Sequence, residues 1–147
     1  MLHAIATRAR SAPVLRRAMS GCAHTDSLLA ANRALLDAIG AGDFAAYNSL
    51  CASDITCIEP ETLGTIVTGT RFHEHYFDLP SSPAAPAKTT HLLNVVGKCC
   101  SAGKMGVVTY NRLVQTGVEC SLSQETRVWE QDNGEWKQIH FHKSMVE

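Results

Sequence analysis

Residues 104–145 read KMGVVTYNRLVQTGVECSLSQETRVWEQDNGEWKQIHFHKSM, and this stretch decides the fold. Apolar and polar side chains alternate along it with a period of two, as on β-strands that bury one face. Gly117 and the turn Asp132-Asn133-Gly134 divide it, and Gly97 and Gly103 separate it from a similar segment before it. The pattern predicts an antiparallel meander of four strands, Thr89–Val96, Lys104–Val114, Ser121–Gln131 and Glu135–Met145.

The chain before residue 80 has helical periodicity instead. A long first helix is predicted by an apolar stripe of Leu28, Leu29, Leu35, Leu36 and Ile39. Thr25 or Asp26 is expected to cap its start, and Gly40 and Gly42 are expected to end it. Asp43 caps a second, shorter helix, whose apolar side is Phe44, Tyr47 and Leu50.

A short strand at 54–58 and a third helix at 71–77 follow, and the Pro-rich linker 79–86 precedes the meander. Helices first and an antiparallel meander afterwards indicate an α+β domain in which a curved sheet folds round the long helix.

The 147 residues, 45% of them hydrophobic, suit one globular domain. Residues 1–25 hold four arginines and no acid, which is typical of a mitochondrial or chloroplast transit peptide; a disordered basic tail is the alternative, with the protein then cytoplasmic. The domain proper is 26–147, where nine basic and fourteen acidic residues give a charge of −5. We therefore expect no nucleic-acid partner and no membrane partner.

Three cations fall on strand faces that their neighbours mark as buried. Arg112 shares a face with Val108 and Tyr110, Arg127 shares one with Trp129, and Lys143 alternates with Ile139, Phe141 and Met145. An unpaired buried charge costs several kcal/mol, so these cations need buried carboxylates, water or an anionic ligand. Two explanations stay open: a cationic cavity that accepts an anion, or structural pairing with Glu59, Glu61 or Glu125.

Other chemistries have less support in the sequence. The six cysteines show no zinc spacing, and we expect them to be reduced small hydrophobes, mostly buried. His73 and His75 point apart on a helix, and His140 and His142 lack a nearby third ligand, so no metal and no cofactor is expected. No phosphate loop, nucleophile elbow or kinase motif is present, and no catalytic residue is assigned.

Several motifs together identify a resemblance. The stretches Ala41–Tyr47, Ile58–Gly64, Phe72–Phe77 and Glu125–Trp129, followed by His140-Phe141-His142, resemble the association, or hub, domain of calcium/calmodulin-dependent protein kinase II. The resemblance runs in order over nearly all of residues 26–143. It implies an NTF2-like α+β cone fold and assembly into stacked rings of many subunits.

The resemblance also implies a ligand pocket, formed by Tyr47, His73, Arg112, Arg127 and Lys143. The sequence departs from the family at Lys143, which stands where the hubs have an arginine, and at Ser81, which stands where the kinase hubs have a tryptophan. The hairpin at 116–120 is also shorter.

We therefore expect a non-catalytic oligomerisation hub without a kinase domain, whose partners are further copies of itself and a small carboxylate. One alternative is an adaptor that joins rings of a full-length kinase of the family. Another is a small NTF2-like enzyme of the isomerase or dehydratase type, with Glu59, Glu61 or His73 as general base.

Overall fold

A computed structural model describes residues 24–79 and 87–146, so the predicted leader lies almost entirely outside the described residues, as does most of the Pro-rich linker. The elements in chain order are α1 (Thr25–Ala41), α2 (Phe44–Ser49), β1 (Cys51–Ile58), the 3₁₀ turn η1 (Pro60–Thr62), β2 (Val67–Thr68), α3 (Arg71–Phe77), β3 (Lys88–Cys99), β4 (Met105–Thr116), β5 (Glu119–Asp132) and β6 (Glu135–Met145). Among these residues no helix is long and apolar enough to span a membrane.

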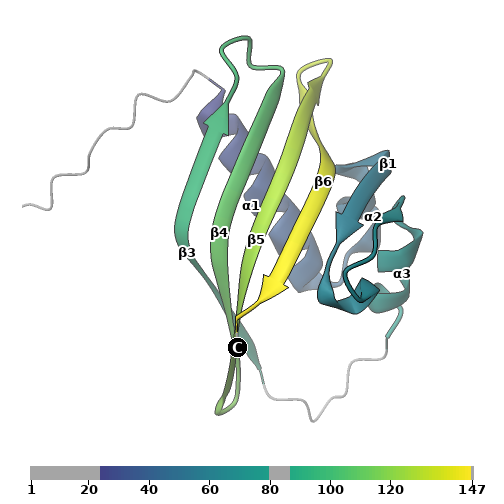
Figure 1. The fold of residues 1–147 in the computed structure, drawn as a ribbon, viewed down its shortest axis with the longest axis vertical. Helices are drawn as coiled ribbons and strands as arrows, with labels where there is room; N and C mark the ends of the chain where they lie inside the picture. Colours follow the sequence, from purple (N-terminus) through teal and green to yellow (C-terminus); the bar gives the residue numbers. More distant parts are fainter. Residues whose placement is uncertain (1–23, 80–86, 147) are drawn as a thin grey trace, which may run out of the picture.

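The strands form one sheet in the order β2-β1-β6-β5-β4-β3, and α1 lies across one of its faces (Figure 1). The predicted meander is confirmed, because β3 to β6 pair consecutively and antiparallel. The sheet as a whole is mixed, since β1 runs parallel to β6. That pairing joins strands that are far apart in sequence, so local periodicity could not show it.

Two of the predicted helix ends are confirmed and one is wrong. Gly42 ends α1 in the left-handed conformation (φ 69°), and the Asp43 carboxylate accepts a hydrogen bond from the Ala46 N–H at 2.9 Å at the start of α2. Neither Thr25 nor Asp26 caps α1, because the helix begins one residue earlier than expected, with His24 as its N-cap. Asp26 instead lies in the first turn, where its charge favours the helix dipole.

Glycines let α1 approach the sheet closely. A Cβ at Gly106 would lie 2.6 Å from Leu28 Cδ2, and a Cβ at Gly97 would lie 2.9 Å from Leu29 Cδ2. Gly97 was expected to end a strand, but it lies inside β3, which continues to Cys99. Its lack of a side chain serves helix packing rather than a turn.

A β-bulge in β6 changes which side chains face the helices. Trp129 pairs with Gln138 and Val128 pairs with His140, so Ile139 is an extra residue without a partner in β5. Gln138 before the bulge is completely buried, and Phe141 beyond it is buried as well. The prediction that Ile139 shares the inner face with Phe141 and Lys143 is therefore wrong.

The cysteine prediction holds only in part. Cys51 and Cys57 are buried, whereas Cys99 is half-buried and Cys100 and Cys120 are exposed. Cys22 lies outside the described residues.

Candidate functional site

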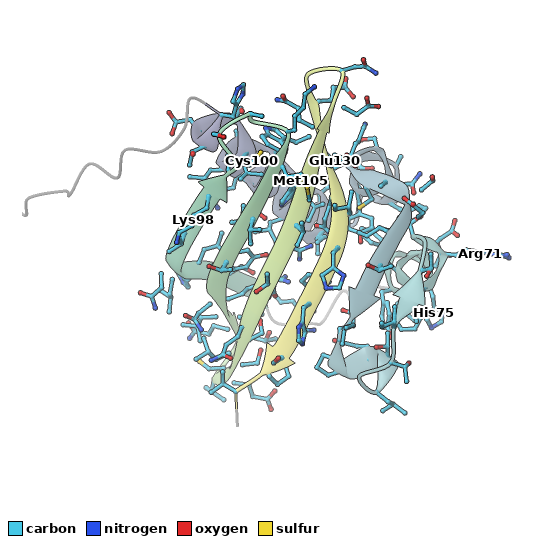
Figure 2. The ribbon with its side chains drawn as sticks, turned by 45° about the horizontal axis from the view of Figure 1, so that its top comes forward. Arg71, His75, Lys98, Cys100, Met105 and Glu130 are labelled. Carbon is cyan, nitrogen blue, oxygen red and sulfur yellow. The ribbon has the colours of Figure 1, made fainter. Side chains whose placement is uncertain are left out.

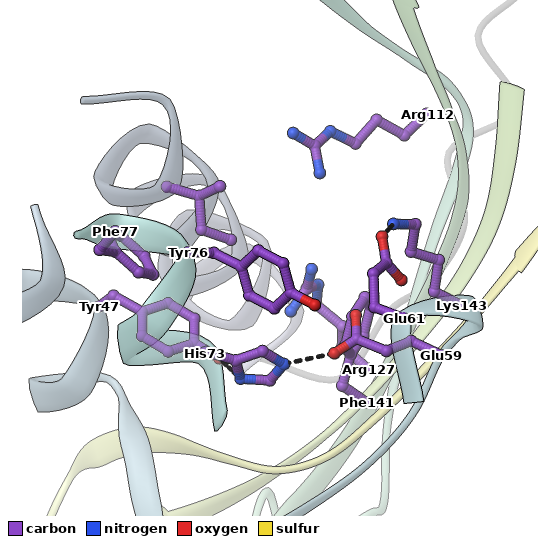
Figure 3. A pocket seen from close by; sticks show the side chains of 11 residues that line it. Tyr47, Glu59, Glu61, His73, Tyr76, Phe77, Arg112, Arg127, Phe141 and Lys143 are labelled. Atoms are coloured by element: carbon purple, nitrogen blue, oxygen red, sulfur yellow. Dashed lines mark hydrogen bonds and ion pairs between the residues drawn. The ribbon is translucent and has the colours of Figure 1, made fainter. Parts of the chain in front are cut away.

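One cavity of about 200 Å³ opens between the helices and the inner face of β4, β5 and β6 (Figure 3). It brings together all five residues of the predicted pocket and two of the three candidate carboxylates. The lining residues are Ile39, Tyr47, Glu59, Glu61, His73, Tyr76, Phe77, Arg112, Arg127, Phe141 and Lys143.

A buried hydrogen-bonded chain runs along the helical wall of the cavity. The Tyr47 hydroxyl lies 2.8 Å from His73 Nδ1, and His73 Nε2 lies 2.6 Å from Glu59 Oε1. With Tyr47 donating, the imidazole is the Nε2–H tautomer and donates to the carboxylate. Burial raises the pKa of Tyr47 well above its usual value, so the phenol keeps its proton. Both ring nitrogens of His73 are thus occupied.

The floor of the pocket is a buried ionic network of Arg127, Glu125, Tyr110 and Gln138. Arg127 donates from Nε to the Tyr110 hydroxyl at 2.7 Å, from Nη1 to Gln138 Oε1 at 2.7 Å and from Nη2 to Glu125 Oε2 at 3.1 Å. Its guanidinium carbon lies 3.9 Å from the centre of the Phe141 ring, a cation–π contact. Arg127 is 1% exposed, and every one of its side-chain nitrogens has a protein partner.

Glu125 is the shared counter-ion of this floor. Its carboxylate also accepts hydrogen bonds from the Tyr110 hydroxyl at 2.7 Å and the Ser123 hydroxyl at 3.0 Å. Burial by itself would raise the pKa of Glu125, but Arg127 and Arg112 together with the hydrogen bonds from Tyr110 and Ser123 outweigh it and hold the pKa below its usual value. Burial raises the pKa of Tyr110 to about 12. The carboxylate is therefore ionised and the phenol protonated at neutral pH.

The mouth of the pocket, formed by Arg112, Lys143 and Glu61, is more exposed. Lys143 Nζ and Glu61 Oε1 form an ion pair of 2.5 Å between side chains that are 19% and 35% exposed. Within residues 24–79 and 87–146, Arg112 forms an ion pair only with Glu125 Oε1, at 3.6 Å, which is beyond a good hydrogen bond. Its buried Nε has no hydrogen-bond partner among the described residues.

Figure 3 shows the Arg112 guanidinium directed into the cavity, away from the Lys143–Glu61 pair. The two arginines share one carboxylate, and Arg127 has the shorter contacts to it. Among the described residues, Arg112 is consequently the pocket cation with the longest ionic contact.

The sequence did not assign Gln138, Tyr76, Phe77 and Phe141 to the site. Phe141 was expected on the buried face of its strand, and Tyr76 and Phe77 were expected only as part of the third helix; their aromatic character gave no signal that they also line a cavity. The inward position of Gln138 was not predicted, because the bulge at Ile139 reverses the alternation of inward and outward side chains along β6. Among the residues that the structure describes, no three His, Cys, Asp or Glu side chains are placed to hold a metal ion.

The fold is that of NTF2-like proteins, an α+β cone with helices packed on a six-stranded mixed sheet. An NTF2-like protein from Cytophaga hutchinsonii superposes with a TM-score of 0.67 over 82% of this chain and 97% of its own, at 21% identity. At that identity the likeness concerns the fold alone.

The family follows from the sequence profile of the calcium/calmodulin dependent protein kinase II association domain, which matches residues 25–147. This chain belongs to that family. The solved hub homology domain of Chlamydamonas reinhardtii is 36% identical, with a TM-score of 0.76 over 83% of this chain and 98% of that one. The association domain of C. elegans is 32% identical, with a TM-score of 0.73 over 83% and 95%.

A full-length relative shows how much of such a protein this chain represents. The rabbit (Oryctolagus cuniculus) calcium/calmodulin-dependent protein kinase type II subunit delta is 34% identical over 131 residues. The match covers 83% of this chain but only 24% of the rabbit subunit.

Proposed function

We propose that this chain is an oligomerisation domain that associates with further copies of itself into a ring-shaped multimer. Membership of the association-domain family supports this function. The observation that carries it is the sheet face turned away from α1, which no described helix covers and where Leu93, Met105 and Val107 are 42%, 45% and 37% exposed. Exposed apolar side chains gathered on one face are typical of interaction surfaces.

Light scattering on the purified chain tests self-association. We expect a mass many times the 15.9 kDa of one chain, and electron microscopy should show closed rings. A folded protein with the mass of a single chain would contradict the proposal. Coexpression with a full-length kinase of the family tests the adaptor role, which requires mixed rings.

We also propose that the pocket accepts a small carboxylate, held by Arg112. Among the described residues, the Arg112 guanidinium is close to one carboxylate, that of Glu125, which it shares with Arg127. Arg112 Nε is buried and has no hydrogen-bond partner among these residues. A ligand carboxylate would supply the hydrogen bonds that Arg112 lacks, since a guanidinium binds carboxylates through two parallel N–H donors.

Thermal unfolding tests this ligand class. At a hundredfold excess over Kd, a ligand that binds only the folded state stabilises it by about 2.7 kcal/mol. Small monocarboxylates should therefore raise the melting temperature, and uncharged amides of the same shape should not. The effect should disappear in Arg112→Met and persist in Arg71→Met, because Arg71 is exposed on α3 and does not line the pocket. Equal shifts with acid and amide would refute the proposal.

We propose binding rather than catalysis because the candidate general bases are already engaged. His73 uses both ring nitrogens, Glu59 accepts from His73, and Glu61 pairs with Lys143. The runner-up function, an enzyme of the isomerase or dehydratase type, would need one of these groups to face a substrate proton. A screen of ketone and carboxylate substrates tests it, and turnover that Glu59→Gln abolishes would favour the enzyme.

A further inference from the structure

Glu61 places a carboxylate of the chain itself in the mouth of the pocket. The residue belongs to η1 and lines the cavity. Its Oε1 lies 2.5 Å from Lys143 Nζ, and Figure 3 shows this pair at the side of the cavity, apart from the Arg112 guanidinium. Glu61 therefore makes with Lys143 the kind of contact that a ligand carboxylate makes with a cation.

The charges around the cavity balance within the protein. Three cations and three carboxylates of the described residues surround it, namely Arg112, Arg127, Lys143, Glu59, Glu61 and, in the floor, Glu125. The neutral tautomer of His73 adds no charge. A ligand carboxylate would bring a fourth negative charge to three positive ones, and like charges in one cavity repel each other. The balance is restored when one of the protein carboxylates moves out.

Glu61 is the carboxylate that can move out most easily. Glu125 and Glu59 are 2% and 6% exposed and accept hydrogen bonds from buried partners. The Glu61 side chain is 35% exposed, and among the described residues its carboxylate pairs with Lys143 alone. Water can solvate this carboxylate once it turns outward, so breaking the pair costs little.

The backbone that carries Glu61 is held in place by its own hydrogen bonds. The Thr62 hydroxyl accepts from the Glu59 N–H at 3.3 Å and donates to the Thr65 carbonyl at 2.7 Å, and the Thr65 hydroxyl donates to the Thr62 carbonyl at 2.7 Å. Pro60 fixes a further backbone torsion of the turn. Rotation about the side-chain bonds of Glu61 is therefore enough to move its carboxylate, while the turn keeps its shape.

We propose that Glu61 is an internal competitor of the pocket ligand. Its carboxylate occupies Lys143 and turns outward when a ligand carboxylate enters the cavity. This inference rests on the proposed binding of a carboxylate at Arg112, and it adds the residue that limits the affinity. Removing the charge of Glu61 leaves the pocket with one excess positive charge, which suits a monocarboxylate.

Isothermal titration calorimetry of the whole chain with butyrate and butyramide tests the competition. Glu61→Gln keeps the size of the side chain and removes its charge, so this variant should bind butyrate roughly three- to tenfold more tightly than the wild type. Butyramide is uncharged and should gain no affinity. Glu61→Asp keeps the charge, so its affinity for butyrate should stay closer to that of the wild type than to that of Glu61→Gln.

Glu74→Gln is the matched control, because it removes the same charge from a residue outside the cavity. Glu74 is exposed on α3 and does not line the pocket. It lies one helical turn from Arg71, whose side chain points away from the sheet in Figure 2. This variant should bind butyrate like the wild type. Circular dichroism checks that every variant is folded.

The outcomes separate this inference from the proposed function. If the wild type binds butyrate and Glu61→Gln binds it no more tightly, Glu61 is not a competitor, although the carboxylate site stands. An equal gain for butyramide would also overturn the inference, because the variant would then have changed the space in the pocket and not its charge. Binding of butyrate by Glu61→Gln alone would support the competition. If neither protein binds butyrate, the proposed carboxylate site is wrong as well.

Discussion

The floor and the mouth of the pocket use the same residue types in different solvent environments. In the floor, Arg127 and Glu125 are 1% and 2% exposed and hydrogen-bonded on every side. In the mouth, Arg112 has one long contact, and the Lys143–Glu61 pair is partly exposed to water. Buried charges must keep their partners, whereas partly exposed charges can exchange them. The floor therefore serves stability, and the mouth is where we propose that a ligand binds.

The largest expected effect that separates the two regions is the loss of the floor arginine. Arg127→Met removes every hydrogen bond of the guanidinium and leaves Glu125 buried beside the weaker contact with Arg112. Breaking a buried pair in this way costs about 3–5 kcal/mol. Urea unfolding should show this loss in the free energy of unfolding. Arg112→Met is the matched control and should cost clearly less; equal losses would erase the distinction between floor and mouth.

A smaller effect is expected from the floor amide. Gln138→Leu removes the acceptor of Arg127 Nη1, and an unsatisfied buried donor costs about 1–3 kcal/mol. The loss should lie toward the lower end, because Gln138 Nε2 already has no partner among the described residues. Urea unfolding measures it, with Gln131→Leu outside the floor as control. No change in stability would mean that Arg127 does not depend on this hydrogen bond.

The pH dependence of stability tests the contribution of the Glu125 carboxylate to the floor. The pKa of Glu125 is lower in the folded state than its usual value, so the ionised carboxylate stabilises the fold. That contribution is complete above the unfolded-state pKa, about 4.3, and is lost as the pH falls through the folded-state pKa. The stability difference between wild type and Glu125→Gln should therefore shrink on acidification from about pH 6 to about pH 3.

A constant difference across that pH range would show that Glu125 is not the titrating group. Glu61→Gln is the comparison variant, since its carboxylate lies in the mouth.

The smallest effect is expected in the mouth. Lys143→Met breaks a partly exposed ion pair, and such pairs contribute about 0–1 kcal/mol. Thermal unfolding in low and high salt measures this contribution, which should decrease with salt because of screening. A loss of stability as large as that of Arg127→Met would show that Lys143 contributes to stability like the residues of the floor.

The sequence predicted much of the fold because its patterns are local. The two-residue period located β3 to β6, and the same period put Arg112, Arg127 and Lys143 on inward faces. Asp43 capped its helix as expected. These features depend on neighbouring residues in the chain, which a single sequence displays.

Other features depend on contacts between distant segments. The parallel pairing of β1 with β6 and the bulge that buries Gln138 have no local signature. Periodicity also could not show which of the three cations is most closely paired, because that depends on which carboxylate lies near each of them in the folded chain. Arg127 reaches Glu125 closely, Lys143 reaches Glu61, and Arg112 is left with the longest contact.

The extra residue at Ile139 has a consequence for anyone who aligns or edits this strand. Every position of β6 after it has the opposite odd–even assignment from the positions before it. A straight strand of the same length would present His140 and His142 to the pocket and turn Phe141 and Lys143 outward. Removing Ile139 together with the bulge would instead leave Phe141 and Lys143 in place. A related strand that lacks Ile139 and the bulge can therefore keep Phe141 and Lys143 in the pocket, although its alignment with β6 has a one-residue gap. A strand of equal length that aligns without a gap keeps them there only if it has the bulge.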